Sequence, residues 1–234
     1  MPFKESLACG LQKRLGNLWK GDDDSDFTVV IEGVSFKCHR FILKACSGFL
    51  QGMFKSQMQE RLENRASLVG MSASTFDVII SAIYKGIDGL NNDNVLDVWS
   101  ATELLQIDYL IEECQDFVTR NIAVDSCFRF YNHATMYAAH GVVDHSLDFI
   151  SRHFNDIIDK DNLLHLPFDS FYKVIANDNL KTNYEDPVLA TIFNWVAYTP
   201  QSAQSASLDS GKSYINLHMC SAAMYVMSNI CQSA

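Results

Sequence analysis

Apolar and polar residues follow a helical period at the start of the chain and a strand period after it. Four leucines at helical spacing predict an amphipathic first helix: Leu7, Leu11, Leu15 and Leu18. Two strands are then predicted at 28–31 and 34–38, joined by a turn at Glu32–Gly33. A short third strand is expected at 67–69.

Helical periods occupy most of the remaining residues up to about 120. One helix is predicted over 40–53, with Ser47 as a small residue inside it. Further helices are expected to end near Tyr84, Gln106 and Arg120. The pattern therefore predicts an α+β domain in which a small sheet is covered by helical hairpins.

Beyond Asp125 the pattern is helical throughout, which predicts an all-α segment. Helices are expected on both sides of Gly141, over 163–175, and from Asp186–Pro187 to Tyr198. Residues 201–213 are rich in Ser, Ala and Gln, as linkers are, and no clear period follows them. Because no repeat of 20–50 residues occurs, neither a solenoid nor a propeller is expected in this chain.

Composition narrows the class of partner and the compartment. Lys and Arg total 18 against 28 Asp and Glu, a formal charge of -10, which makes nucleic acid a poor partner. Neither a signal peptide nor a membrane span is predicted. The seven cysteines are scattered and form no CxxC pair, as expected of reduced thiols in the cytoplasm or the nucleus.

The sequence contains no pattern that points to catalysis. It has neither a phosphate-binding glycine loop nor a nucleophile elbow, and Ser47 lies within a helical period. His133 and His140 could align on one helix, but a third metal ligand in step with them is missing. His39 is interpreted as a structural histidine between a strand and a helix. We therefore expect no catalytic, metal-binding or cofactor-binding residue, and no enzymatic activity.

An ordered set of positions resembles the BTB/POZ domain, over roughly residues 10–120. The matching residues are Ser25 to Val29, Phe36, His39, Arg40, Leu43, Ala45 to Ser47, Phe49, Met53, Phe54, Phe76, Tyr84, Gly86, Asn94, Val95, Ala101 and Leu104 to Gln106. The later helices resemble, more loosely, the BACK domain of Kelch-like proteins. The residues that carry this second resemblance are Cys127, Tyr131, Phe149, His153, Phe154, Leu166, Pro167, Leu180, Trp195 and Val196.

The resemblance predicts three segments. Residues 1–122 would form the BTB/POZ domain with an N-terminal dimerisation helix, and 123–199 an incomplete BACK domain. Residues 200–234 would be a linker and an unpatterned tail where the family continues with further helices and Kelch repeats. The substrate-binding repeats are therefore expected to be missing, and the substrate cannot be named.

BTB domains of this family form homodimers or pair with related BTB chains, and the resemblance implies the same for this chain. The expected dimer interface contains Leu11 and Leu15 of the first helix, together with Asp26 and Arg40, which match a buried charged pair of the family. An ordinary solvated surface pair remains the alternative for Asp26 and Arg40.

The resemblance also implies a contact with cullin-3, as in substrate adaptors of E3 ubiquitin ligases. Met58-Gln59-Glu60 fits the apolar-x-Glu motif of such adaptors, and Ile107 and Tyr109 match the neighbouring contact region. The predicted function is a non-enzymatic, homodimerising BTB–BACK adaptor that binds cullin-3. The alternative is a BTB scaffold for transcriptional or cytoskeletal regulation that binds no cullin.

Overall fold

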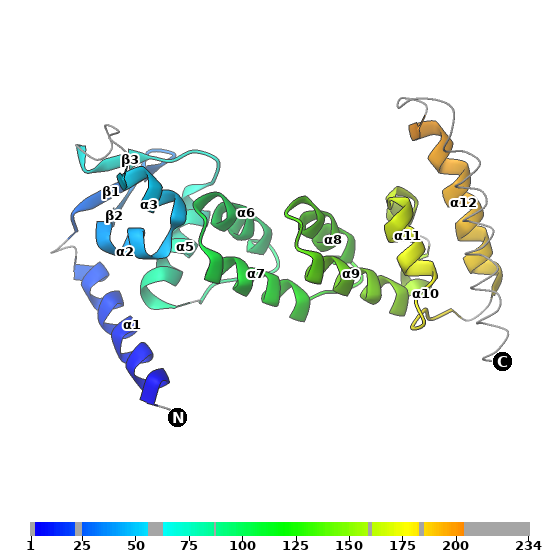
Figure 1. The fold of residues 1–234 in the computed structure, drawn as a ribbon, viewed down its shortest axis with the longest axis horizontal. Helices are drawn as coiled ribbons and strands as arrows, with labels where there is room; N and C mark the ends of the chain where they lie inside the picture. Colours follow the sequence, from blue (N-terminus) through cyan, green and yellow to red (C-terminus); the bar gives the residue numbers. More distant parts are fainter. Residues whose placement is uncertain are drawn as a thin grey trace. The chain divides into compact units, whose positions relative to one another are not determined.

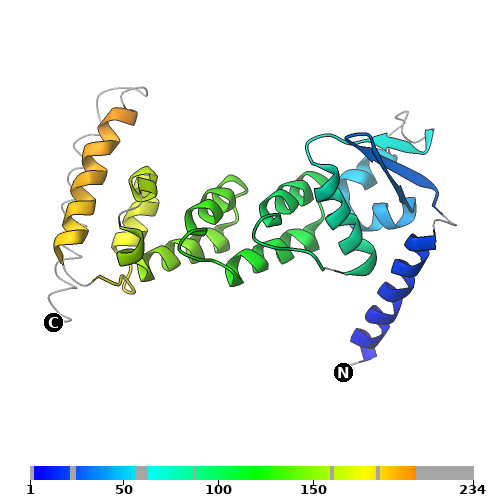
Figure 2. The same cartoon turned by 180° about the vertical axis from the view of Figure 1, so that it is seen from behind.

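The computed structural model divides the chain into two compact units, residues 1–121 and 122–234. It describes residues 3–21, 25–55, 63–86, 88–158, 161–182 and 185–203. Figures 1 and 2 show the elements of both units from opposite sides. The first unit combines a small sheet with helices and the second is entirely helical in its described part, which confirms the predicted fold class.

A three-stranded sheet of order β2-β1-β3 lies in the first unit. Strands β1 (Phe27–Ile31) and β2 (Val34–Cys38) pair antiparallel, and Glu32 and Gly33 join them with φ angles of 51° and 81°, as tight hairpin turns require. Strand β3 (Arg65–Ser67) pairs with β1 in parallel and places Ala66 opposite Val29. The third strand therefore begins two residues earlier than predicted, because the buried Ala66 belongs to its inward face.

Six described helices complete the first unit. They are α1 (Phe3–Gly21), α2 (Arg40–Cys46), α3 (Gly48–Lys55), α5 (Ala73–Lys85), α6 (Val95–Leu105) and α7 (Asp108–Arg120). In Figure 1, α2, α3 and α5 lie beside the strands, and α6 and α7 form a hairpin next to α5. The core between sheet and helices holds Val29, Ile31, Phe76, Ile79 and Trp99, all fully buried.

The single helix predicted over 40–53 is divided at Ser47, so this prediction was wrong. Ser47 has extended backbone angles (φ -124°, ψ 119°), and α3 begins at the next residue. Its hydroxyl donates to the carbonyl oxygen of Leu105 at 2.6 Å and accepts from the N–H of Leu50 at 3.0 Å. Ser47 therefore caps α3 and is bonded to the end of α6, a tertiary contact that a helical period does not reveal.

The second unit consists of short helices. They are α8 (Cys127–Met136), α9 (His140–Arg152), α10 (Phe154–Ile157), the 3-10 helix η1 (Asp161–His165), α11 (Phe168–Ile175) and α12 (Glu185–Ala203). The helix break predicted at Gly141 is not there, because Gly141 lies inside α9. The chain turns instead at Ala138, whose φ is 53°. Helix α12 passes through Pro200, so the first residues of the predicted linker are helical, and the rest lies outside the described residues.

Trp195 of α12 centres the core of the second unit. Its ring stacks on Phe171 of α11 with 4.9 Å between centroids, and its Nε1–H donates to the carbonyl oxygen of Leu166 at 3.0 Å. Phe154, Ile157 and other buried apolar side chains pack in the same cluster. This Trp–carbonyl bond satisfies the polar atom of a ring that is otherwise buried among apolar groups.

Candidate interaction surfaces

An open hollow of about 540 Å³ lies in the first unit, where the α2–α3 junction meets the α6–α7 junction. From the first junction it is lined by Lys44, Ala45, Cys46, Ser47, Gly48 and Gln51, and from the second by Gln106, Asp108 and Tyr109. Its walls come from segments far apart in sequence, so the fold alone brings them together.

Close backbone contacts build this hollow. The N–H of Gly48 donates to the carbonyl oxygen of Gln106 at 3.0 Å, beside the bond from Ser47 to Leu105. Gln106 ends α6 in the left-handed conformation (φ 53°, ψ 59°). A Cβ added at Gly48 would lie 2.8 Å from Gln106 Oε1 and 3.2 Å from Gln106 Cβ. A larger residue at position 48 would therefore force the Gln106 side chain to move, because its amide would have to turn away and its Cβ would have to shift by a few tenths of an ångström.

Cys46 and Tyr109 give the hollow its chemical character. Burial raises the pKa of Tyr109, and the adjacent Cys46, to which it is hydrogen-bonded, raises it further. Burial also raises the pKa of the Cys46 thiol, although the hydrogen bond with Tyr109 lowers it in part. Both groups therefore stay protonated at neutral pH, and the hollow offers hydrogen bonds and an aromatic surface without a reactive thiolate.

The residues predicted to contact cullin-3 differ in their exposure, and two of them lie outside the described residues. Tyr109 lines the hollow with 41% of its surface exposed. Ile107 is 0% exposed, so it holds the α6–α7 junction from inside and cannot touch a partner in this conformation. Met58 and Glu60 lie outside the described residues. Of the other lining residues, the sequence placed Ala45, Cys46, Ser47 and Gln106 in the BTB pattern without a contact role. It gave no sign of Lys44, Gly48 or Gln51 at this surface.

Helix α1 is fixed to the first unit by its second half. The Trp19 ring stacks on Tyr84 of α5 at 5.3 Å, its Nε1–H donates to the carbonyl oxygen of Lys37 at 2.9 Å, and Lys85 Nζ lies 4.5 Å from its centroid. Gly16 faces the same helix: an added Cβ would lie 3.3 Å from the carbonyl oxygen of Tyr84. Gly16 thus lets α1 pack closely against α5, and Trp19 fixes its position through specific contacts.

The predicted apolar face of α1 remains open in the single chain. Leu11 is 59% and Leu18 is 52% exposed, while Leu15 is half-buried. The side chain of Leu7 lies outside the described residues. Phe41 of α2 is also largely exposed. An apolar stripe of this kind on a folded domain is typical of a surface that is covered by another chain.

Asp26 and Arg40 are connected, but through the backbone of Arg40. The exposed Asp26 carboxylate accepts from the N–H of Arg40 at 2.7 Å, which satisfies a free donor in the first turn of α2. The Arg40 guanidinium donates to Asn64 Oδ1 at 2.6 Å and lies 5.2 and 5.0 Å from the ring centroids of Phe27 and Phe54. Burial of this pair at a dimer interface stays a prediction about the assembly.

His39 has the structural role that the sequence predicted. Its backbone N–H donates to the Tyr84 hydroxyl at 2.9 Å, and its Nδ1 is hydrogen-bonded to the same hydroxyl at 2.9 Å. Burial raises the pKa of Tyr84 strongly, with a partial opposing effect from the bond to His39. The protonated Tyr84 thus joins the β2–α2 connection to α5.

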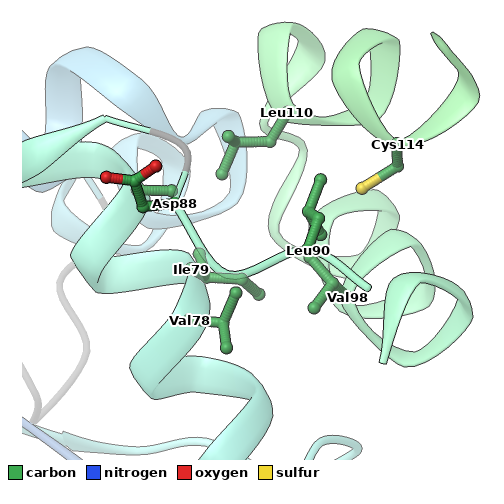
Figure 3. A pocket seen from close by; sticks show the side chains of 8 residues that line it. Val78, Ile79, Asp88, Leu90, Val98, Leu110 and Cys114 are labelled. Atoms are coloured by element: carbon green, nitrogen blue, oxygen red, sulfur yellow. The ribbon is translucent and has the colours of Figure 1, made fainter. Parts of the chain in front are cut away.

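A second, much smaller cavity lies between α5, α6 and α7 (Figure 3). Val78, Ile79, Leu90, Val98, Leu110 and the Cys114 thiol surround it, and the exposed Asp88 borders it on the side away from Cys114. Its volume of about 10 Å³ is that of a single water molecule. Burial raises the pKa of Cys114 to about 12. The cavity is a packing void and does not suit an organic ligand.

Among the residues that the structure describes, no group of three or more His, Cys, Asp or Glu side chains is placed to hold a metal ion. Among the same residues, every helix is too short or too polar to cross a membrane.

Comparison with known proteins agrees with this architecture. The BTB/POZ domain model matches residues 15–122, and the model described as "BTB And C-terminal Kelch", the BACK domain, matches residues 127–224. This chain is a BTB–BACK protein. The BACK match extends past residue 199, where the sequence had suggested its end, and includes most of the segment interpreted as a linker and tail.

The relatives of this BTB–BACK protein include Kelch-like proteins and proteins named for Kelch repeats and a BTB domain. It is 26% identical over 179 residues to Kelch repeat and BTB domain-containing protein 3 of Homo sapiens, covering 76% of this chain and 29% of that protein. It is 27% identical over 200 residues to Kelch repeat and BTB domain-containing protein 12 of Danio rerio (86% and 32%), and 25% identical over 194 residues to Kelch-like protein 6 of Homo sapiens (83% and 31%). The chain therefore spans about a third of the length of these relatives.

Proposed function

We propose that this BTB–BACK protein is a homodimerising adaptor that binds cullin-3 as part of an E3 ubiquitin ligase. Its cullin contact would be the hollow between the α2–α3 and α6–α7 junctions. The observation that carries the proposal is the exposed Tyr109 in an open hollow whose other wall is the start of α3. A concave surface with an aromatic group and a few polar groups suits an apolar anchor from a partner helix.

The position of the apolar-x-Glu motif supports the same surface. Helix α3 contributes Gln51 to the hollow and ends at Lys55, and Met58 follows three residues later. Three residues span at most about 11 Å of chain, so Met58 cannot be far from the end of α3. In this proposal Met58 supplies an apolar anchor, Glu60 a polar contact and Tyr109 an aromatic one, whereas the buried Ile107 only positions Tyr109.

Binding of purified cullin-3 N-terminal domain, measured by calorimetry, tests the proposal. We expect the Met58→Ala, Glu60→Ala double variant to weaken binding by at least about 2 kcal/mol, because few buried anchors carry most of the energy of such interfaces. Tyr109→Ala should weaken it too. Tyr172→Ala is the matched control, since Tyr172 of the second unit is 40% exposed, as Tyr109 is 41%. Undiminished binding by the double variant would reject the motif assignment.

Absence of any binding by the wild-type chain would favour the alternative function, a BTB scaffold for transcriptional or cytoskeletal regulation that uses no cullin. Circular dichroism of each variant separates lost contact from lost folding. Because Tyr109 is partly exposed at a helix start, its replacement is expected to leave the helical signal intact.

A further inference from the structure

The two faces of the β2-β1-β3 sheet differ in what covers them. Helices cover one face, where the ring of Phe36 in β2 meets the ring of Phe76 in α5 with 5.0 Å between their centroids. Successive side chains of a strand point to opposite faces, so the residues that alternate with Phe36 form the other face. Four side chains of this second face are exposed: Ser35, Lys37, Arg65 and Ser67. Within the described part of the chain, this face is therefore open.

The strand register places two cations on the open face, one on either side of Thr28. Thr28 of β1 lies opposite Lys37 of β2 and opposite Arg65 of β3. Residues directly opposite each other on neighbouring strands point to the same face, and neighbouring strands lie about 4.8 Å apart. The stems of Lys37 and Arg65 therefore begin about 10 Å apart, with a hydroxyl between them. In the next row of the register, Ser35 and Ser67 add two further hydroxyls.

These two cations are not neutralised by ion pairs of the chain itself. Among the residues that the structure describes, no carboxylate forms an ion pair with Lys37 or Arg65. The carboxylates at the two ends of β1 are bonded elsewhere: Asp26 accepts from the first N–H of α2 at 2.7 Å, and Glu32 accepts from the first N–H of α5 at 3.0 Å. In a chain with a formal charge of -10, the open face thus offers two positive charges and three hydroxyl donors to an anionic ligand.

We propose that the row Lys37–Thr28–Arg65 binds the phosphate group of a phosphorylated serine or threonine in a partner protein. Such a phosphate carries about -1.5 to -2 charges at pH 7 and accepts hydrogen bonds through three oxygens. The planar guanidinium of Arg65 donates two parallel bonds to a phosphate, Lys37 brings a second charge on a flexible stem, and Thr28 adds a hydroxyl donor. This site is separate from the hollow and does not depend on the proposed cullin contact.

The charges around the row favour a single phosphate over a polyanion. Asp26 lies two residues before Thr28 and Glu32 four residues after it, or about 7 and about 13 Å along β1. Nucleic acid or an acidic membrane surface would bring further negative charges against these two carboxylates. A peptide brings one phosphate between them, with neutral or basic residues on either side. A phosphoprotein is therefore the source of phosphate that fits this charge pattern.

Fluorescence polarisation on the full chain tests the proposal. The probe is the labelled peptide Gly-Val-Ala-phosphoserine-Ala-Val-Gly, compared with the same peptide that carries serine. We expect the phosphorylated form to bind at least about tenfold more tightly, because the charge-assisted contacts depend on the phosphate. Lys37→Gln and Arg65→Gln should each weaken its binding about fivefold, whereas Lys37→Arg keeps the charge and should retain the affinity. Lys13→Gln is the matched control: it removes one charge from an exposed lysine of α1 in the same unit and should change the affinity by less than about twofold.

Four results would overturn the proposal. Equal binding of the two peptides would mean that the phosphate is not recognised. A loss in Lys13→Gln as large as in Lys37→Gln and Arg65→Gln would mean that the peptide responds only to the total charge. Displacement of the probe by inorganic phosphate as effectively as by unlabelled phosphopeptide would assign the row to free phosphate. Cosedimentation with vesicles of phosphatidylcholine and phosphatidic acid that Arg65→Gln abolishes would assign it to a lipid headgroup.

The variants themselves are expected to fold normally. Lys37 and Arg65 are both exposed, so replacing either by glutamine should leave the circular dichroism spectrum and the melting temperature unchanged. A weaker affinity in these variants then reports a lost contact with the phosphate, and Lys37→Arg repeats the test at the same position with the charge retained.

Discussion

The hydroxyl of Ser47 donates to the carbonyl oxygen of Leu105 at 2.6 Å, although 58 residues separate the two along the chain. The same hydroxyl accepts from the N–H of Leu50, and Ser47 is only 2% exposed. One small side chain thus ends α2, caps α3 and attaches both to the end of α6. Both junctions that form the hollow depend on it.

Ser47→Ala should destabilise the protein by about 1–3 kcal/mol, because it leaves a buried carbonyl oxygen and a buried N–H without their partner. Chemical denaturation measures the change in the free energy of unfolding. Ser35→Ala, on the exposed side of β2, is the control and should alter stability by less than about 0.5 kcal/mol. Equal effects at the two serines would show that the Ser47 bond contributes nothing of its own.

Gly48 and Gly52 form a natural pair for testing the close approach of the junctions. Both lie in α3, but an added Cβ at Gly48 would meet Gln106 at 2.8 Å, whereas one at Gly52 would meet nothing within 4 Å. Gly52→Ala should stabilise the helix by about 0.5–1 kcal/mol. Gly48→Ala should gain less or destabilise, because Gln106 must move, and it should also weaken partner binding at the hollow. Thermal melts of the two variants side by side decide the point.

Alkaline pH should destabilise the first unit through its buried thiols. Burial raises the pKa of Cys38 and of Cys114 from 9.0 to about 12. Between pH 9 and 12 the unfolded chain therefore loses these protons while the folded chain retains them. The stability contributed by each thiol is complete below pH 9 and is lost as the pH rises toward 12, with a slope of about 1.4 kcal/mol per pH unit at most.

Denaturation of the wild type and of Cys114→Ala across pH 7 to 10.5 isolates this contribution. The variant should lose stability less steeply above pH 9, whatever its stability at neutral pH. Parallel curves for the two proteins would mean that the Cys114 thiol titrates alike in the folded and unfolded states.

Leu11→Asp together with Leu18→Asp should convert a dimer into a monomer, if the exposed stripe of α1 is the dimer contact proposed for the BTB domain. Both leucines are more than half exposed, so their replacement should cost the single chain little stability. Sedimentation or light scattering at micromolar concentration reports the mass. Met136→Asp changes a residue of the second unit that is 67% exposed, and it should leave the mass unchanged. A dimer that tolerates both α1 substitutions would place its interface elsewhere.

The sequence predicted those elements whose cause is local. The first two strands and their turn follow from alternation and from Glu32–Gly33, and the structure has them within one residue. The break at Ser47 could not be predicted, because its cause is a carbonyl oxygen 58 residues away. The helix break predicted at Gly141 was wrong. Glycine commonly follows the end of a helix, but here it lies inside α9.

The candidate site was predictable only through its resemblance to the BTB domain. That resemblance pointed to Tyr109, which lines the hollow, but also to Ile107, which is buried. Residues two positions apart at a helix start lie about 200° apart around its axis, and the sequence alone does not tell which one faces outward. The hollow itself depends on the Gly48–Gln106 contact, so it exists only once the two junctions have met.

The parallel pairing of β3 with β1 has a thermodynamic consequence for the segment that contains Met58 and Glu60. Helix α3 fixes one end of that segment at Lys55, and the bond from the N–H of Thr28 to the carbonyl oxygen of Asn64 fixes the other. Closing a loop at both ends removes part of the conformational entropy that a free tail of equal length would retain, a cost that grows slowly with loop length. In the proposed complex, a partner that binds Met58 and Glu60 would therefore pay a smaller ordering cost than it would on a free tail with the same motif.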